Sequence, residues 1–119
     1  MKKIISVDFD GVLNSYLTPF TTASELTDPP VPGAIEWLQS LIDKFNVNIF
    51  STRCIEVEGQ IAIANWLLRW GLSHESINLL HFTAIKHGAS VYIDDRAWRF
   101  EGTFPSCDEL EKFKPWNKI

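Results

Sequence analysis

The sequence predicts an α/β fold built on a small doubly wound parallel sheet of about four strands, of the Rossmann-like type. Two observations predict this class. Short apolar segments alternate along the 119 residues with segments of helical periodicity, and 45% of the residues are hydrophobic, which is enough for one core. Alternating strands and helices favour parallel pairing through right-handed crossovers. We therefore expect a single-domain, three-layer α/β/α sandwich.

The first half of the chain contains two predicted strands and one predicted helix. Residues 4–7 are short, apolar and partly β-branched, which is typical of a buried strand. Residues 33–45 carry apolar side chains at helical spacing, and Pro32 before them suits a helix start. Residues 47–50 form a second apolar segment, which we interpret as the next strand.

A second helix is predicted over residues 57–70. Gly71 stands where its C-terminal end is expected. At helical spacing, the apolar face of this helix is expected to contain Ile61, Ala64 and Leu68. The helix would connect the second strand of the sheet to a third.

The last part of the chain adds two predicted strands, over residues 77–80 and 91–93. No helix is predicted between residues 72 and 86. Residues 106–109 read Ser-Cys-Asp-Glu, which is the pattern of a capping box. They predict a last short helix that ends before Pro115.

Residues 14–31 form the one long segment without periodicity. A structureless loop of this length is uncommon inside a compact domain and is often functional. Because it directly follows the first predicted strand, we interpret it as a flap or lid over a site. A surface loop without such a role is the alternative. The insertion is too short for a separate cap, so residues 1–119 are expected to form one domain.

Composition excludes several classes of function. Eleven Lys and Arg against fifteen Asp and Glu give a net charge of −4, which argues against generic polynucleotide binding. No apolar run approaches the roughly 20 residues that span a bilayer, so we expect no membrane partner. The start of the chain lacks a signal-peptide pattern, and two cysteines fit a reduced protein. We therefore expect a cytoplasmic protein; its oligomeric state is not indicated.

Two carboxylates, Asp8 and Asp10, lie where the first strand should end. Residues two apart on a strand point to the same side, so both acids can face one point in space. Like charges held that close repel, and a cation or a shared proton is then expected nearby.

Polar residues also follow the other predicted strands. In parallel sheets the carboxyl ends meet at one edge, where ligands bind. Each residue alone has an ordinary interpretation as a turn residue, helix cap or solvated charge, but their joint occurrence favours a site. The residues are Ser51, Thr52 and Arg53 after the second strand, Asp94, Asp95 and Arg96 after the last, and Lys86 before it.

These motifs resemble the haloacid dehalogenase (HAD) superfamily of phosphatases and phosphotransferases. Residues 8–13 match its Asp-x-Asp-Gly-Val-Leu motif, and Ser51, Lys86 and the Asp94–Asp95 pair match the other three motifs in the family's order. Residues 92–97 and the ending Lys114-Pro115-Trp116 are similar to small, cap-less members. The resemblance implies a HAD-type sheet without a cap domain. It also implies a phosphoric monoester hydrolase that forms an aspartyl phosphate.

The resemblance also implies roles for single residues. Asp8 would be the nucleophile, and Asp10 would protonate the leaving oxygen and then activate water. Ser51 would donate a hydrogen bond to a phosphoryl oxygen, and Lys86 would neutralise negative charge. Mg²⁺ would be held by Asp8, Asp94 and the backbone carbonyl of Asp10, with Asp95 binding through water or supporting Asp94.

Substrate contacts are expected from residues beside the motifs. Arg53, Thr52 and Asn14 are candidates, and Arg96 is a weaker one; alternatively the arginines pair with local carboxylates and Asn14 serves the turn. The expected substrate is a phosphorylated metabolite, a nucleotide or a nucleic-acid end. Two other functions stay open: a HAD-like binding or assembly module without catalysis, and a receiver-type signalling domain phosphorylated on aspartate. The receiver is disfavoured because Ser51 and Thr52 stand where its acceptor Asp is needed.

Overall fold

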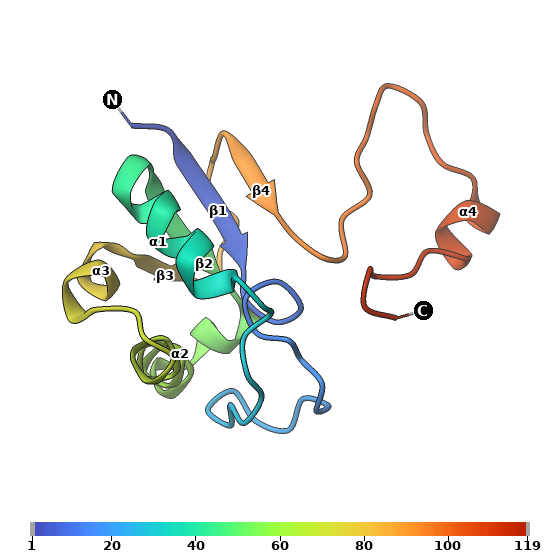
Figure 1. Ribbon diagram of the computed structural model, residues 1–119. Coiled ribbons are helices and arrows are strands. Elements are labelled where there is room, and N and C mark those ends of the chain that lie inside the picture. Colours follow the sequence, from blue (N-terminus) through green and yellow to red (C-terminus); the bar gives the residue numbers. More distant parts are fainter. Residues whose placement is uncertain (1, 119) are drawn as a thin grey trace.

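Four parallel strands form the centre of the computed structural model, which describes residues 2–118 (Figure 1). Their order is β3-β2-β1-β4, so β1 is bonded on both sides. In register, Val7 lies opposite Ile49 of β2 and Ile93 of β4. The predicted α/β class and parallel sheet are confirmed. The strands are β1 (Ile4–Asp8), β2 (Asn46–Phe50), β3 (His81–Thr83) and β4 (Val91–Ile93).

Helices connect the strands much as the sequence periodicity predicts. Residues before β2 form α1, and a single 3₁₀ turn, η1, follows β2 directly. The predicted capping box at Ser106 and Glu109 is present and opens α4. No described helix combines the length and apolar character needed to cross a membrane. The helical segments are α1 (Ala34–Lys44), η1 (Thr52–Ile55), α2 (Val57–Arg69), α3 (His74–Leu79) and α4 (Cys107–Glu111).

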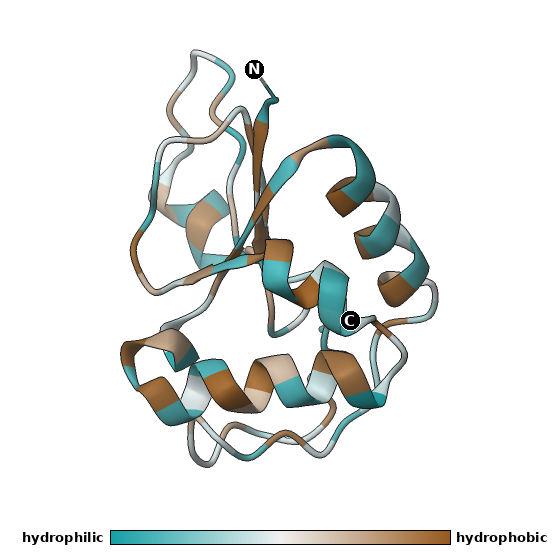
Figure 2. Ribbon diagram, turned by 90° about the vertical axis from the view of Figure 1, so that its left-hand side faces the viewer, coloured by the Kyte–Doolittle hydropathy of each residue, from teal (hydrophilic) through white to brown (hydrophobic). Residues whose placement is uncertain are grey.

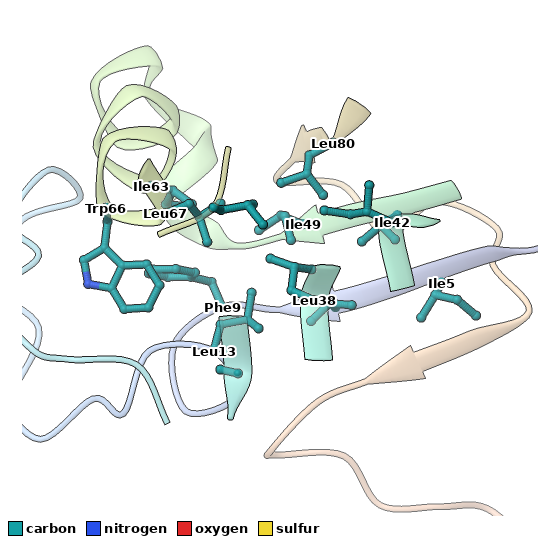
Figure 3. Packing of buried hydrophobic residues seen from close by; sticks show 14 of the residues in the cluster. Ile5, Phe9, Leu13, Leu38, Ile42, Ile49, Ile63, Trp66, Leu67 and Leu80 are labelled. Atoms are coloured by element: carbon teal, nitrogen blue, oxygen red, sulfur yellow. The ribbon is translucent and has the colours of Figure 1, made fainter. Parts of the chain in front are cut away.

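One hydrophobic cluster holds the sheet, α1 and α2 together (Figure 3). Trp66 of α2 meets Phe9 edge to face, with ring centroids 5.0 Å apart. Such aromatic pairs contribute beyond their buried area. Leu38 of α1, together with Val7 and Ile49 of the strands, is fully buried in the same cluster. Phe9 immediately follows β1, so this cluster fixes the backbone between Asp8 and Asp10.

The predicted apolar face of α2 is wrong. Ile61 is 55% exposed and Leu68 also faces solvent, whereas Ile63, Trp66 and Leu67 are buried. Apolar residues occur around most of this helix, as the mixed colouring of the helices in Figure 2 illustrates. Periodicity alone therefore could not select the packed face. The contact with Phe9 and the rest of the cluster selects it.

The predicted strand over residues 77–80 is also wrong. Residues 77–79 form the second half of α3, and the strand β3 begins only at His81. The Ser73 side chain accepts a hydrogen bond from the Ser76 amide and caps the helix. A short apolar run bounded by polar residues does not distinguish a strand from a buried helical turn, and the serine cap decides in favour of the helix.

A helix layer on the second face of the sheet is not confirmed. The side chains of α1 and α2 pack in the cluster that contains Ile5 and Val7. On the opposite face of the sheet, Ser6 and Tyr92 instead border an open hollow of about 720 Å³. Among the described residues, α4 is the one helix after β4, and it buries none of its residues. Figure 1 shows the chain leaving the sheet after β4 and running far from it before α4.

Candidate functional site

An acidic cluster lies at the carboxyl edge of the sheet. Asp8 ends β1, and Asp94 and Asp95 follow β4. Because β1 and β4 pair in parallel, these strand ends are neighbours. One carboxylate oxygen from each of the three residues lies within 4.8 Å of the others. The structure thus brings together three of the four predicted metal-binding residues, and their oxygens suit a hard divalent cation.

Gly11 makes this convergence possible. Its backbone has a φ of 87°, in the left-handed region that favours glycine. A Cβ atom at this position would collide with the Asp95 carboxylate. The Gly11 carbonyl accepts a hydrogen bond of 2.8 Å from the Trp116 indole nitrogen, which ties the C-terminal segment to this turn.

Burial and the neighbouring acidic groups raise the pKa of Asp8 from 3.8 to about 8. Burial is the largest cause, followed by a side-chain hydrogen bond with Asp95 and the negative charges of Asp94 and Asp95. The Phe9 amide donates a hydrogen bond of 2.9 Å to the Asp8 carboxylate and partly opposes the shift. Without a cation, the carboxyl of Asp8 therefore holds a proton at neutral pH.

Asp10 lies outside the acidic cluster. Its carboxylate accepts two hydrogen bonds from Arg53, of 2.7 and 3.1 Å, and one of 2.8 Å from the Asn14 amide. A carboxylate bound in this bidentate manner is held firmly. The structure therefore gives Asp10 a fixed partner in place of the free position that a proton-transfer residue needs.

Arg53 connects Asp10 to the loop over residues 14–31. Its side chain is only 3% exposed. Beyond Asp10, its guanidinium donates to three backbone carbonyls of the loop, and it lies 4.9 Å from the centre of the Phe20 ring. These contacts favour the alternative of pairing with a local carboxylate over substrate binding. The carbonyls belong to Thr22, Ala23 and Glu25.

The loop over residues 14–31 is attached at several further points. The Trp66 indole donates a hydrogen bond of 2.9 Å to the carbonyl of Asp28. The Asp28 carboxylate accepts bonds from both the amide and the hydroxyl of Thr18. Asn14 forms bridges with Asp10 and Pro30 at the base of the loop. These bonds hold the loop against α2 and Arg53, and whether it moves as a lid stays a prediction.

A hollow of about 330 Å³ lies beside the acidic cluster. Six of the predicted site residues line it, and Tyr16, Phe20, Phe50 and Arg96 complete its wall. Tyr16 has a φ of 56°, which is rare for a residue with a side chain, and no sequence pattern pointed to it or to Phe20. The predicted residues in this hollow are Asp8, Asp10, Ser51, Thr52, Asp94 and Asp95.

Two other predicted site residues, Ser51 and Lys86, differ from each other in burial and in the hollow that they line. Ser51 is buried, and its hydroxyl accepts a 3.1 Å hydrogen bond from the Arg53 amide, as a cap of η1. Lys86 is exposed and lines the larger hollow, together with Asp8 and Asp94. Its ammonium lies 4.8 Å from the centre of the Tyr92 ring. Within residues 2–118 it forms no ion pair with the acidic cluster.

Comparison with known proteins adds no assignment. No protein-family model, no curated protein and no solved structure matches this chain. The fold and the side chains at its carboxyl edge therefore define the class of molecule: an α/β protein with a parallel sheet and a three-carboxylate cluster.

Proposed function

We propose that the protein is a Mg²⁺-dependent phosphoric monoester hydrolase of the HAD type. The observation that carries the proposal is the convergence of Asp8, Asp94 and Asp95 at the ends of two paired strands. Their motifs occur in the order of that superfamily. The neighbouring hollow, which contains Ser51 and Thr52, offers room for a phosphoryl group.

The cluster fits a magnesium ion on chemical grounds. Mg²⁺ prefers carboxylate and water oxygens. A positive charge would also relieve the repulsion by which Asp94 and Asp95 help to raise the pKa of Asp8. The residues that would hold it are Asp8 and Asp94, with Asp95 directly or through water. When bound, the ion would supply charge neutralisation and orientation of the phosphoryl oxygens.

The chain's own residues supply the remaining chemistry. Asp8 in its ionised form attacks phosphorus, the bond to the ester oxygen breaks, and a water molecule later cleaves the aspartyl phosphate. Thr52 is exposed and lines the hollow, so its hydroxyl can donate to a phosphoryl oxygen. Asp10 transfers protons only if its pairing with Arg53 loosens when substrate binds.

An aryl phosphate assay tests this proposal. The purified protein should hydrolyse p-nitrophenyl phosphate with Mg²⁺ and lose this activity with EDTA. Asp8→Asn should reduce kcat at least about a thousandfold, because it removes the nucleophile. Asp43→Asn, at an exposed position of α1, is the matched control and should leave kcat unchanged. Turnover that survives Asp8→Asn would show that the nucleophile is assigned wrongly.

A specific observation favours a second candidate, a cation-binding module without turnover. Arg53 and Asn14 together occupy the Asp10 carboxylate, which is the expected proton donor. This candidate predicts that the protein binds Mg²⁺ by calorimetry but hydrolyses none of a broad panel of phosphate esters. Lasting phosphorylation of Asp8 by acetyl phosphate, without turnover, would instead indicate a receiver-type domain.

A further inference from the structure

We infer that the larger hollow binds the leaving group of the substrate, and that this group carries an aromatic base, so that the ligand is a nucleoside phosphate. The inference rests on the proposed function, because it takes the acidic cluster as the position of the phosphoryl group. It goes further by choosing one of the three open substrate classes. Three features of the hollow support the inference: its position, its aromatic lining residues and its positive charges.

The position of the larger hollow suits a leaving group. It shares Asp8, Phe50 and Asp94 with the smaller hollow, so the two hollows lie next to each other at the acidic cluster. Its volume of about 720 Å³ lies in the range of small-molecule sites. A phosphate ester placed with its phosphorus at Asp8 can therefore extend its organic part across the uncovered face of the sheet.

Three aromatic side chains, Phe50, Tyr92 and Trp98, line this hollow. Trp98 lines it with 43% of its surface exposed, and Phe50 lies at the junction with the smaller hollow. The Tyr92 ring is held in place by its hydroxyl, which donates to the His87 carbonyl at 2.6 Å and accepts from the Ala89 amide at 3.2 Å. Flat rings bind other flat rings by stacking, and every nucleobase offers such a surface.

Positive charges lie at the same hollow. Lys86 is held over one face of the Tyr92 ring, which leaves the exposed Trp98 ring as the stacking surface. Arg99 also lines the hollow, and its contact with Glu101 is long, at 3.9 Å between exposed groups. In a chain of net charge −4, two cations beside an aromatic surface favour an anionic ligand with a ring. A sugar phosphate has no aromatic ring to stack on Trp98.

Calorimetry in the presence of Mg²⁺ tests the inference without turnover, in the Asp8→Asn background. Adenosine 5′-monophosphate should bind at least about tenfold more tightly than ribose 5-phosphate, since stacking adds to the phosphate contacts. Adding Trp98→Ala should remove most of this difference. Trp37→Ala is the matched control, because Trp37 has a similar exposure of 37% and lies on α1 outside the hollow.

A 5′-phosphorylated dinucleotide separates a free nucleotide from a nucleic-acid end. If the natural ligand is a strand end, the dinucleotide binds more tightly than the mononucleotide, and Lys86→Gln removes the gain. Lys44→Gln is the control, because Lys44 also lies over an aromatic ring, that of Phe45, away from the hollow. Equal affinity for both nucleotides assigns the site to the mononucleotide.

Two outcomes would overturn the inference. One is equal affinity for adenosine 5′-monophosphate and ribose 5-phosphate. The other is that Trp98→Ala weakens the affinity for both ligands by the same factor while the circular dichroism stays unchanged. Trp98 would then support the site without stacking on a base. Both readouts are binding constants. A protein that binds nucleotides through Trp98 but hydrolyses no ester would refute the hydrolase and leave the binding assignment standing.

Discussion

The two parts of the chain before and after Thr83 differ sharply in packing. All buried residues described in the structure, including the whole hydrophobic cluster, lie at or before Thr83. From Ala84 to Lys118 no residue is fully buried, and large apolar side chains such as Phe104 are exposed. The acidic cluster takes Asp8 from the packed part and Asp94 and Asp95 from the other. The site therefore depends on a segment without a fully buried residue, which meets the core through the pairing of β4 with β1 and the half-buried Ile93.

The largest expected effect tests the packed part at Arg53. Arg53→Ala leaves the Asp10 carboxylate and three loop carbonyls without their donor. We expect the free energy of unfolding to fall by about 3–5 kcal/mol, because a buried ion pair loses one member. Urea denaturation measures this. Arg99→Ala, in the other part, should change it by about 0.5 kcal/mol at most. Similar losses of stability in both variants would contradict the difference in packing between the two parts.

Leucine truncation compares the two parts directly. Leu67→Ala on α2 creates a cavity in the hydrophobic cluster and should cost about 2–5 kcal/mol. Leu110→Ala on α4 removes a half-exposed side chain and should cost less than about 1 kcal/mol. Thermal melts of the two variants measure the contrast. A large cost at Leu110 would show that residues 84–118 carry a core of their own.

Glycine substitutions test the junction between the two parts. Gly11→Ala introduces strain at positive φ and a collision with Asp95. We expect a loss of about 1–2 kcal/mol in stability and a clear weakening of Mg²⁺ binding. Gly102→Ala has the same sign of φ but open space around its Cβ, so it should cost about 1 kcal/mol and leave Mg²⁺ binding intact. Unchanged Mg²⁺ binding in Gly11→Ala would contradict a site that includes Asp95.

The pH dependence of Asp8 tests the acidic cluster where the two parts meet. Its folded pKa of about 8 exceeds the ordinary 3.8, so between these values the folded protein keeps a proton that the unfolded chain releases. The free energy of unfolding therefore falls as pH rises through this range. In EDTA at pH 9, Asp8→Asn should be more stable than the parent by at least about 1 kcal/mol. Near pH 4 the gain should disappear, whereas Asp43→Asn should show no gain at either pH.

One helix, one strand and the parallel pairing illustrate what was predictable from the sequence. The helix over residues 33–45, the strand over residues 47–50 and the parallel sheet agree with the structure. The segment over residues 77–80 and the packed face of α2 were not predictable, because short or all-round apolar patterns need the contacts of the folded chain to be resolved. The uncovered face of the sheet depends on where a mainly irregular segment runs, which no periodicity encodes.

The candidate site was predictable where it depends on strand ends alone. Asp8, Asp94 and Asp95 meet because the carboxyl ends of paired parallel strands share one edge. The position of Arg53 could not be derived, because its partners come from a loop whose path has no sequence signature. Lys86 was placed by order alone, and in the structure it borders the larger hollow.

The hydrogen bond between Trp116 and the Gly11 carbonyl has a practical consequence for purification. A polyhistidine tag fused at the C-terminal end would follow the segment whose Trp116 indole contacts the Gly11 turn, and this turn lies against the Asp95 carboxylate. Its imidazoles bind transition-metal ions readily and would bring them to the candidate magnesium centre. A tag placed before β1 would begin at the opposite edge of the sheet, so N-terminal fusions are the safer choice for metal titrations.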